Sequence, residues 1–206
     1  MATKHSVLAQ LRAQRWGFER SGDAPAFALA ERQAAVLLAL TGNDIQAVEH
    51  PIRYSPCITV VSAKIPTSGL SFWADHQWVI TLNQGESSAR QRFTLLHEYK
   101  HIIDHPSVDW LYRDRPDSSA NQQAERAADY FAGSVLVPQQ VLSALWSVGV
   151  REPAELARHF EVSAGTIAVR LRQVGLIDTS HLLPPDLLEA HSTAVPTTPA
   201  PEGRAA

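Results

Sequence analysis

The stretch Gln91-Arg-Phe-Thr-Leu-Leu-His-Glu-Tyr-Lys-His101 decides how the rest of the chain is interpreted. His97 and His101 are four residues apart, so on an α-helix they lie one turn apart on the same face. Their ring nitrogens can then bind one metal ion, each at about 2.0–2.1 Å. Glu98 would project beside that ion, where it can take a proton from a bound water. The spacing predicts a catalytic zinc helix; the alternative is a solvated helix face with ordinary polar side chains.

The residues around this motif predict a rigid helix. Ser87 or Ser88 can cap its start, and His105-Pro106 ends it after Asp104. Five apolar side chains can bury it in a core: Phe93, Leu95, Leu96, Ile102 and Ile103. The motif therefore sits on a packed element rather than on a solvated one.

A catalytic zinc ion usually has three protein ligands, so a third ligand is expected. Glu125 is the candidate, on a second helix that a capping box at Ser119-x-x-Gln122 would open. Asp129 lies one turn later, where its carboxylate can accept the outer N–H of a ligand histidine. The competing interpretation places Glu125 on a solvated polar face.

His105 is the rival third ligand. Eight residues turn a helix about 80° beyond two full turns, so its side chain begins to leave the face of His97. The longer signature H-E-x-x-H-x-x-G-x-x-H is absent, because Asp104 and Ser107 stand at its glycine and third histidine. We expect His105 to be a cation at the helix C-terminus and Asp104 to be a candidate outer contact of the metal site.

The remaining pattern predicts an α+β fold that is mainly helical. Ala26–Leu40 is rich in alanine and leucine and predicts a helix. Three short runs of β-branched and aromatic residues predict a small antiparallel sheet of about three strands: Ile58–Ser62, Gly69–Trp73 and Trp78–Leu82. A loop is expected over Ser107–Pro116.

We expect three parts along the chain: a zincin-like domain over residues 1–140, a helical module over 141–183, and a disordered tail rich in Pro, Thr and Ala over 184–206. In the module, two helices joined by a short turn have the spacing of a helix-turn-helix. Arg170 and Arg172 on the second helix could contact nucleic acid. Packing or docking is the favoured role of the pair, and DNA binding is possible but not favoured.

Composition narrows the classes of protein. The 206 residues are 45% hydrophobic, with a formal net charge of -3, so no global basic surface favours nucleic acid. Cys57 is the one cysteine, which excludes an internal disulfide. No apolar run approaches the ~20 residues that cross a bilayer, so a cytoplasmic protein without a membrane partner is expected.

The sequence resembles the ImmA/IrrE family of metallopeptidases, which are gluzincin-like H-E-x-x-H enzymes. Three motifs carry the resemblance in the family's order: Gln91–His101, Glu125–Ala132 and Val135–Pro138. The similarity spans about residues 25 to 177. It implies Zn²⁺ as the cofactor, with His97, His101 and Glu125 as its protein ligands and Glu98 as the general base.

The chain departs from the common family pattern near the motif. Tyr99-Lys100 replace Leu-Gly, Ala127 stands where a second Glu is common, and Asp129 stands at an Asn position. None of these changes removes a ligand, and Lys100 would place a cation near the rim of the cleft.

The resemblance further implies a protein substrate. Family members cleave a helix-turn-helix repressor of the XRE or cI type, which switches on a mobile-element, phage or stress-response operon. The alternative function is a non-proteolytic DNA-binding or toxin-like partner in a toxin–antitoxin-type operon. An intact Glu98 favours the enzyme, since a purely structural zinc site needs no base there. The candidates for the oxyanion-stabilising group are Tyr112, Tyr130 and His159.

Overall fold

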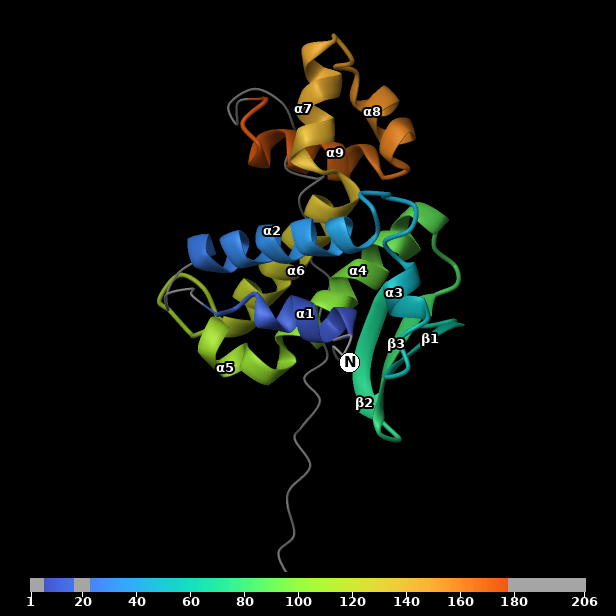
Figure 1. The fold of residues 1–206 in the computed structure, drawn as a ribbon, viewed down its shortest axis with the longest axis vertical. Helices are drawn as coiled ribbons and strands as arrows, with labels where there is room; N and C mark the ends of the chain where they lie inside the picture. Colours follow the sequence, from blue (N-terminus) through green and yellow to red (C-terminus); the bar gives the residue numbers. More distant parts are fainter. Residues whose placement is uncertain (1–5, 17–22, 178–206) are drawn as a thin grey trace, which may run out of the picture.

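The computed structural model describes residues 6–16 and 23–177, which form a mainly helical α+β fold with a three-stranded sheet on one side (Figure 1). The helices are α1 Val7–Ala13, α2 Asp23–Leu40, α3 His50–Arg53, α4 Ser88–Asp104, α5 Val108–Leu111, α6 Ala120–Leu136, α7 Gln139–Ser147, α8 Pro153–Phe160 and α9 Ala164–Gln173. The strands are β1 Ile58–Ala63, β2 Gly69–Ala74 and β3 Gln77–Asn83. The predicted tail, 184–206, lies outside the described residues.

The sheet is mixed, which corrects the antiparallel sheet expected from the sequence. Its order is β1-β3-β2, with β2 antiparallel and β1 parallel to β3. A two-residue turn with positive φ at Asp75 and His76 joins β2 to β3 and makes that pair antiparallel. β3 is the most buried strand and takes the centre, so β1 pairs with its other edge.

Two long helices carry the core beside the sheet. α4 packs on β2 and β3, and α6 packs against both α4 and α2. Leu95, Leu96, Ile102 and Phe131 are fully buried in the shared core. The two helices are therefore fixed side by side, and their facing residues can form one site.

The helix ends agree with the signals expected from the sequence. Ser87 caps α4 by accepting from the Arg90 amide, and Ser119 with Gln122 forms the expected capping box of α6. The prediction of a loop from Ser107 was wrong in its first part. A 3-10 turn at His105–Ser107 and α5 continue helical backbone there.

The C-terminal helices α7, α8 and α9 lie together at one end of the molecule (Figure 1). Glu161 follows the end of α8, and its left-handed φ of 55° turns the chain sharply towards α9. Arg170 of α9 is fully buried, donates to the Val137 carbonyl oxygen at 3.2 Å and lies over the Tyr130 ring. It fits against Gly133 of α6, where a Cβ would lie 3.1 Å from its Cδ. Arg170 thus holds α9 onto α6 and is not available to nucleic acid, which agrees with the packing role favoured from the sequence and removes one of the two arginines that DNA binding would use.

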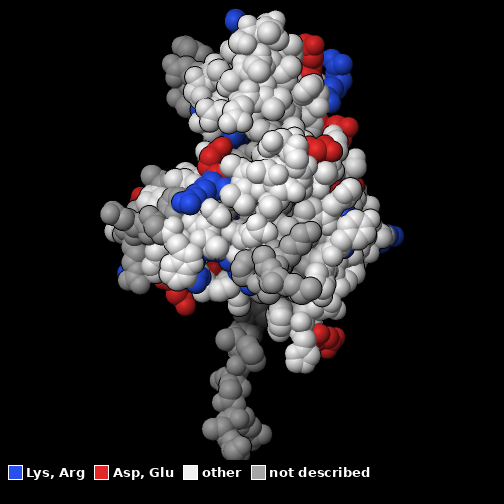
Figure 2. Space-filling view, in the orientation of Figure 1, with Lys and Arg blue, Asp and Glu red and all other residues white. Residues whose placement is uncertain are grey.

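On the face shown in Figure 2, lysines and arginines are scattered among acidic residues rather than gathered into one basic patch. Within residues 6–16 and 23–177, no helix combines the length and the apolar character needed to cross a bilayer.

Candidate metal centre

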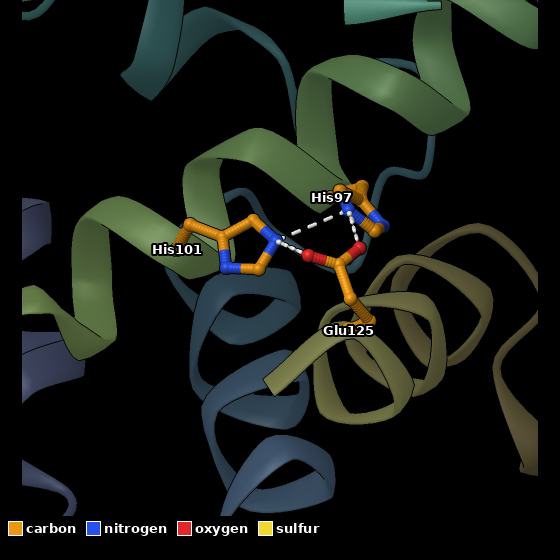
Figure 3. Close-up of side chains that lie close together, drawn as sticks. All are labelled: His97, His101 and Glu125. Carbon is orange, nitrogen blue, oxygen red and sulfur yellow. Dashed lines mark hydrogen bonds and ion pairs between the residues drawn. The ribbon is translucent and has the colours of Figure 1, made fainter. Parts of the chain in front are cut away.

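Three side chains from α4 and α6 converge on one point (Figure 3). His97 and His101 project from successive turns of α4, and Glu125 reaches them from α6. The Nε2 atoms of the two histidines lie 3.1 Å apart. The Glu125 carboxylate oxygens lie 3.2 Å from His97 Nε2 and 3.4 Å from His101 Nε2.

These distances fit the donor set of a zinc ion. Ligand atoms at about 2.05 Å in a tetrahedral arrangement are separated by about 3.3 Å. The 3.1 Å between the two Nε2 atoms and the 3.2 Å from His97 Nε2 to Glu125 Oε2 lie close to that value, and Glu125 Oε1, the other oxygen of the carboxylate, lies 3.4 Å from His101 Nε2. Two imidazoles and one carboxylate leave the fourth position for water, as in catalytic rather than structural zinc sites.

Asp129 fixes the orientation of His97. Its Oδ1 lies 2.8 Å from His97 Nδ1, whereas Glu125 contacts the other ring nitrogen, Nε2. A proton on Nδ1, donated to Asp129, leaves Nε2 with a free lone pair for a metal. The contact between Asp129 and His97 that the sequence led us to expect is therefore present, and the role of Asp129 beside a metal stays a prediction.

Charge at the site is dominated by the two carboxylates of α6. Burial alone would lower the pKa of His97, but the hydrogen bonds to Asp129 and Glu125 outweigh it and raise the pKa to about 10. Burial and the neighbouring His97 lower the pKa of His101. Burial would raise the pKa of Glu125, but its contact with His97 lowers it. The carboxylates of Glu125 and Asp129 therefore give the site negative charge, which favours a bound cation.

Glu98 does not join the three converging side chains. It is nearly buried between α4 and β2, and its Oε2 accepts a hydrogen bond of 2.7 Å from the Ser71 hydroxyl. Gly69, two residues earlier on β2, brings the strand close to α4, because a Cβ there would lie under 3.0 Å from Thr94 Cγ2. One carboxylate oxygen of Glu98 is thus occupied, and the other is free of Ser71.

Ser71 is a residue that the sequence interpretation missed. The signal was present in the period of two along β2, which puts Gly69 and Ser71 on the same face. That this face meets Glu98 follows from the packing of β2 on α4, which the strand pattern alone does not reveal.

The rival third ligand, His105, lies away from the cluster. Its ring contacts Trp78, with ring centres 4.9 Å apart. The group of side chains able to hold a metal ion, among the described residues, consists of His97, His101 and Glu125 and does not include it.

The three candidates for an oxyanion-stabilising group have other contacts. Tyr112 is buried and donates its hydroxyl hydrogen to Asp104. Tyr130 stacks on Phe27, with ring centres 4.9 Å apart. His159, on α8, contacts the ring of its neighbour Phe160. These contacts assign none of the three to the metal site.

Lys100 corrects the expectation of a cation at the cleft rim. Its side chain is 1% exposed and its ammonium group pairs with Asp104 inside the protein. Burial lowers the pKa of Lys100, and the negative charge of Asp104 opposes that shift. The Lys100–Asp104–Tyr112 cluster therefore supports α4 from within the protein and does not face a substrate.

Comparisons with known proteins bear on the family and the fold of the chain. Residues 45–172, more than half of the chain, match the family described as the IrrE N-terminal-like domain of peptidases. Six solved chains match in structure. One of them, a Mycobacterium tuberculosis transcriptional regulator, is 18% identical with a TM-score of 0.50, over 81% of this chain and 52% of that one. The chain thus spans about half the length of that regulator, and the likeness concerns the fold. No curated protein matches this sequence significantly.

Proposed function

Because the chain belongs to the ImmA/IrrE family of metallopeptidases, we propose that it is a zinc-dependent endopeptidase. Its substrate in this proposal is a helix-turn-helix repressor of the XRE or cI type, whose cleavage derepresses a mobile-element, phage or stress-response operon. His97, His101 and Glu125 are the metal ligands, Glu98 is the general base, and Asp129 orients His97.

One observation carries the enzymatic part of this proposal. The three candidate ligand side chains each bring one ligand atom to within 4.8 Å of the others, while Glu98 stays outside the cluster and accepts a hydrogen bond from Ser71. A structural zinc site closes its coordination with a fourth protein ligand, whereas a hydrolytic site keeps a position for water. The cluster that the described residues form holds three donors rather than four.

The zinc ion, when bound, would polarise the scissile carbonyl and make its water more acidic. Glu98 would accept the proton of the attacking water and deliver it to the leaving amine. The Ser71 hydrogen bond would hold one carboxylate oxygen still, so that the other performs this transfer. Burial of Glu98 between α4 and β2 limits the positions that its carboxylate can take.

The edge of the sheet supports a polypeptide substrate. β2 pairs with β3 along one side, and the described residues place no strand along its other side. Leu70, Phe72 and Trp73 of β2 are exposed. An extended segment can add to such an edge through backbone hydrogen bonds, with its side chains received by apolar neighbours. Because Ser71 of the same strand contacts Glu98, a peptide bound there would pass the general base.

The identity of the repressor rests on the family resemblance. The competing function, direct DNA binding by α9, is disfavoured because Arg170 is buried against α6. The fully exposed positions of α9, Ala164, Val169 and Gln173, carry no charge. Arg172 is half-buried, and its Nε donates to the Ala168 carbonyl oxygen of the same helix. A helix that reads DNA ordinarily presents basic or amide side chains to the bases and phosphates.

The test is co-expression of the protein with each helix-turn-helix protein encoded next to its gene. We expect repressor fragments with the wild type and none with Glu98→Gln, because general acid–base groups contribute about 10²–10⁴-fold. The variant should keep its zinc, since Glu98 is not a ligand. Glu155→Gln, at an exposed position of α8, is the matched control and should cleave normally. If Glu98→Gln and Glu155→Gln both relieve repression and neither cleaves the repressor, the protein acts by binding.

A further inference from the structure

A polar cavity of about 550 Å³ lies where the first turn of α4 meets α3 and the turn between α8 and α9. Ser88 and Ala89 of α4 line one side of it, and Arg158 and Glu161 line another. None of the three candidate metal ligands lines this cavity. Its chemistry is therefore independent of the proposed peptidase.

Arg92 supplies a buried cation to the cavity. Its side chain is 8% exposed; Nε lies 3.3 Å from a Glu49 oxygen, and Nη2 donates to the Ile45 carbonyl oxygen. Nη1 has no hydrogen-bond partner in the part of the chain that the structure describes. Glu161 Oε2 is 3.6 Å from Nη1, beyond hydrogen-bond distance, and its side chain is 63% exposed. Buried donors in native proteins are almost always satisfied by protein, water or a bound ion, so this nitrogen calls for an acceptor.

The start of α4 adds donors of its own. Ser87 accepts from the Arg90 amide, while the amides of Ser88 and Ala89 have no acceptor among residues 6–16 and 23–177. α4 is 17 residues long, so its first turn carries the partial positive charge of a long helix. Free amides and partial charge at a helix start bind anions, phosphate in particular.

The formal charges of the cavity also favour an anion. Arg53 and Arg92 both pair with Glu49, which is thereby satisfied. Arg158 then lines the cavity together with Glu161, whose carboxylate is mostly in solvent. The lining thus carries three guanidinium groups against two carboxylates, and the carboxylate of Glu161 is the weakly held one.

We propose that this cavity binds an oxyanion of the phosphate class, either free phosphate or the phosphoryl group of a small phosphorylated molecule. The oxyanion accepts from Arg92 Nη1, from Arg158 and from the amides of the first turn of α4, and it displaces the Glu161 carboxylate. Guanidinium groups suit this role because their planar N–H donors match the oxygens of a phosphate. The volume exceeds that of a bare phosphate and leaves room for a small organic group.

Glu161 gives the proposal a sharp test, because it competes with the ligand. Isothermal titration calorimetry of the full chain with inorganic phosphate, at ionic strength held constant with sodium chloride, should show saturable binding at one site. Arg158→Ala should weaken binding about fivefold or more, since a charge-assisted contact is lost. Glu161→Gln should strengthen binding about fivefold or more, because the competing charge is gone. A parallel titration with glucose 6-phosphate separates the two sources: tighter binding than that of phosphate assigns a phosphorylated molecule, and equal or weaker binding assigns free phosphate.

Arg151→Ala is the matched control. Arg151 is exposed, lies over the Trp146 ring and does not line the cavity, so its loss should leave the affinity unchanged. Arg158 and Glu161 are both exposed, so their variants should fold, whereas a change at Arg92 would disturb its pair with Glu49. Absence of saturable binding in the wild type overturns the proposal. So does failure of either shift, at Arg158 or at Glu161, in the stated direction.

Discussion

The close approach of β2 to α4 depends on Gly69, and Gly69→Ala tests that dependence. A Cβ at this position would lie under 3.0 Å from Thr94 Cγ2 and 3.1 Å from the Thr81 carbonyl oxygen. Ordinary contacts between carbon atoms are about 3.5–4.0 Å. The backbone of Gly69 lies outside the left-handed region, so alanine meets no conformational strain there. The effect of the substitution therefore comes from contact alone.

The magnitude follows from these distances. Relieving the contact with Thr94 requires β2 to move about 1 Å from α4, or Thr94 to turn in a buried environment. Inserting one methyl group into a packed interior costs about 1–3 kcal/mol of the free energy of unfolding. The same movement would lengthen the 2.7 Å bond from Ser71 to Glu98 beyond hydrogen-bond distance. We expect Gly69→Ala to lose both stability and peptidase activity while it keeps its zinc.

Urea unfolding provides the assay, and Thr94→Ser provides the second arm of a double-mutant cycle. Serine lacks the Cγ2 atom that the new methyl meets, so the double variant should be more stable than the sum of the single losses predicts, by about 1 kcal/mol. Gly165→Ala is the control, because a Cβ there meets nothing closer than Ser163 Oγ at 3.6 Å on a helix that favours alanine. Equal stability of Gly69→Ala and wild type, or strict additivity in the cycle, would refute the reasoning.

Four further predictions concern the metal centre and its support. Elemental analysis should find near-stoichiometric zinc in the wild type and little in His97→Ala or Glu125→Ala, and unaltered zinc in either variant would remove that residue from the ligand set. Asp129→Ala should weaken zinc binding about 10–100-fold in a competition titration with a chelator, because His97 loses its orienting partner. At pH 8, zinc binding should release about one proton, because His97, with a pKa of about 10, is protonated before a metal binds. Calorimetry in buffers of different ionisation enthalpy measures this release. A titration without proton release would contradict the raised pKa of His97. Lys100→Met should lower the free energy of unfolding in urea by about 3–5 kcal/mol, because Asp104 would remain buried without its cation. An unchanged unfolding midpoint would contradict the buried ion pair between Lys100 and Asp104.

The sequence predicted the elements that depend on local chemistry. Both long helices begin at their expected serine caps, Ser87 and Ser119, because a side-chain oxygen at the helix start satisfies amides that nothing else nearby can reach. The three strands also lie where β-branched and aromatic residues gather, to within a residue or two. The direction of β1 was not predictable in this way, because strand pairing depends on which strand takes the centre of the sheet.

Buried charge is where the sequence was least informative. Arg92, Lys100 and Arg170 are all nearly or fully buried, although a charged residue on a helix is ordinarily solvated. Each is accommodated by an oppositely charged partner or by a gap that a small residue leaves, such as Gly133 for Arg170. The candidate metal ligands could be proposed from the sequence because zinc requires specific residue types at specific spacing. A buried charge, by contrast, can be accommodated in many ways.

The position of Gly133 on the same helix as Glu125 restricts how the length of the chain can vary. The two residues are eight positions apart, so Gly133 is rotated about 80° from Glu125 around α6 and displaced by about 12 Å. One residue inserted between them would rotate one end of α6 relative to the other by about 100°. Either Glu125, the proposed metal ligand, or the gap at Gly133 that receives Arg170 would then face away from its partner. Seven inserted residues would nearly restore the angular phase but would add about 10 Å along the axis. Insertions and deletions in related sequences are therefore expected outside this interval, for instance in the segment 148–152 between α7 and α8.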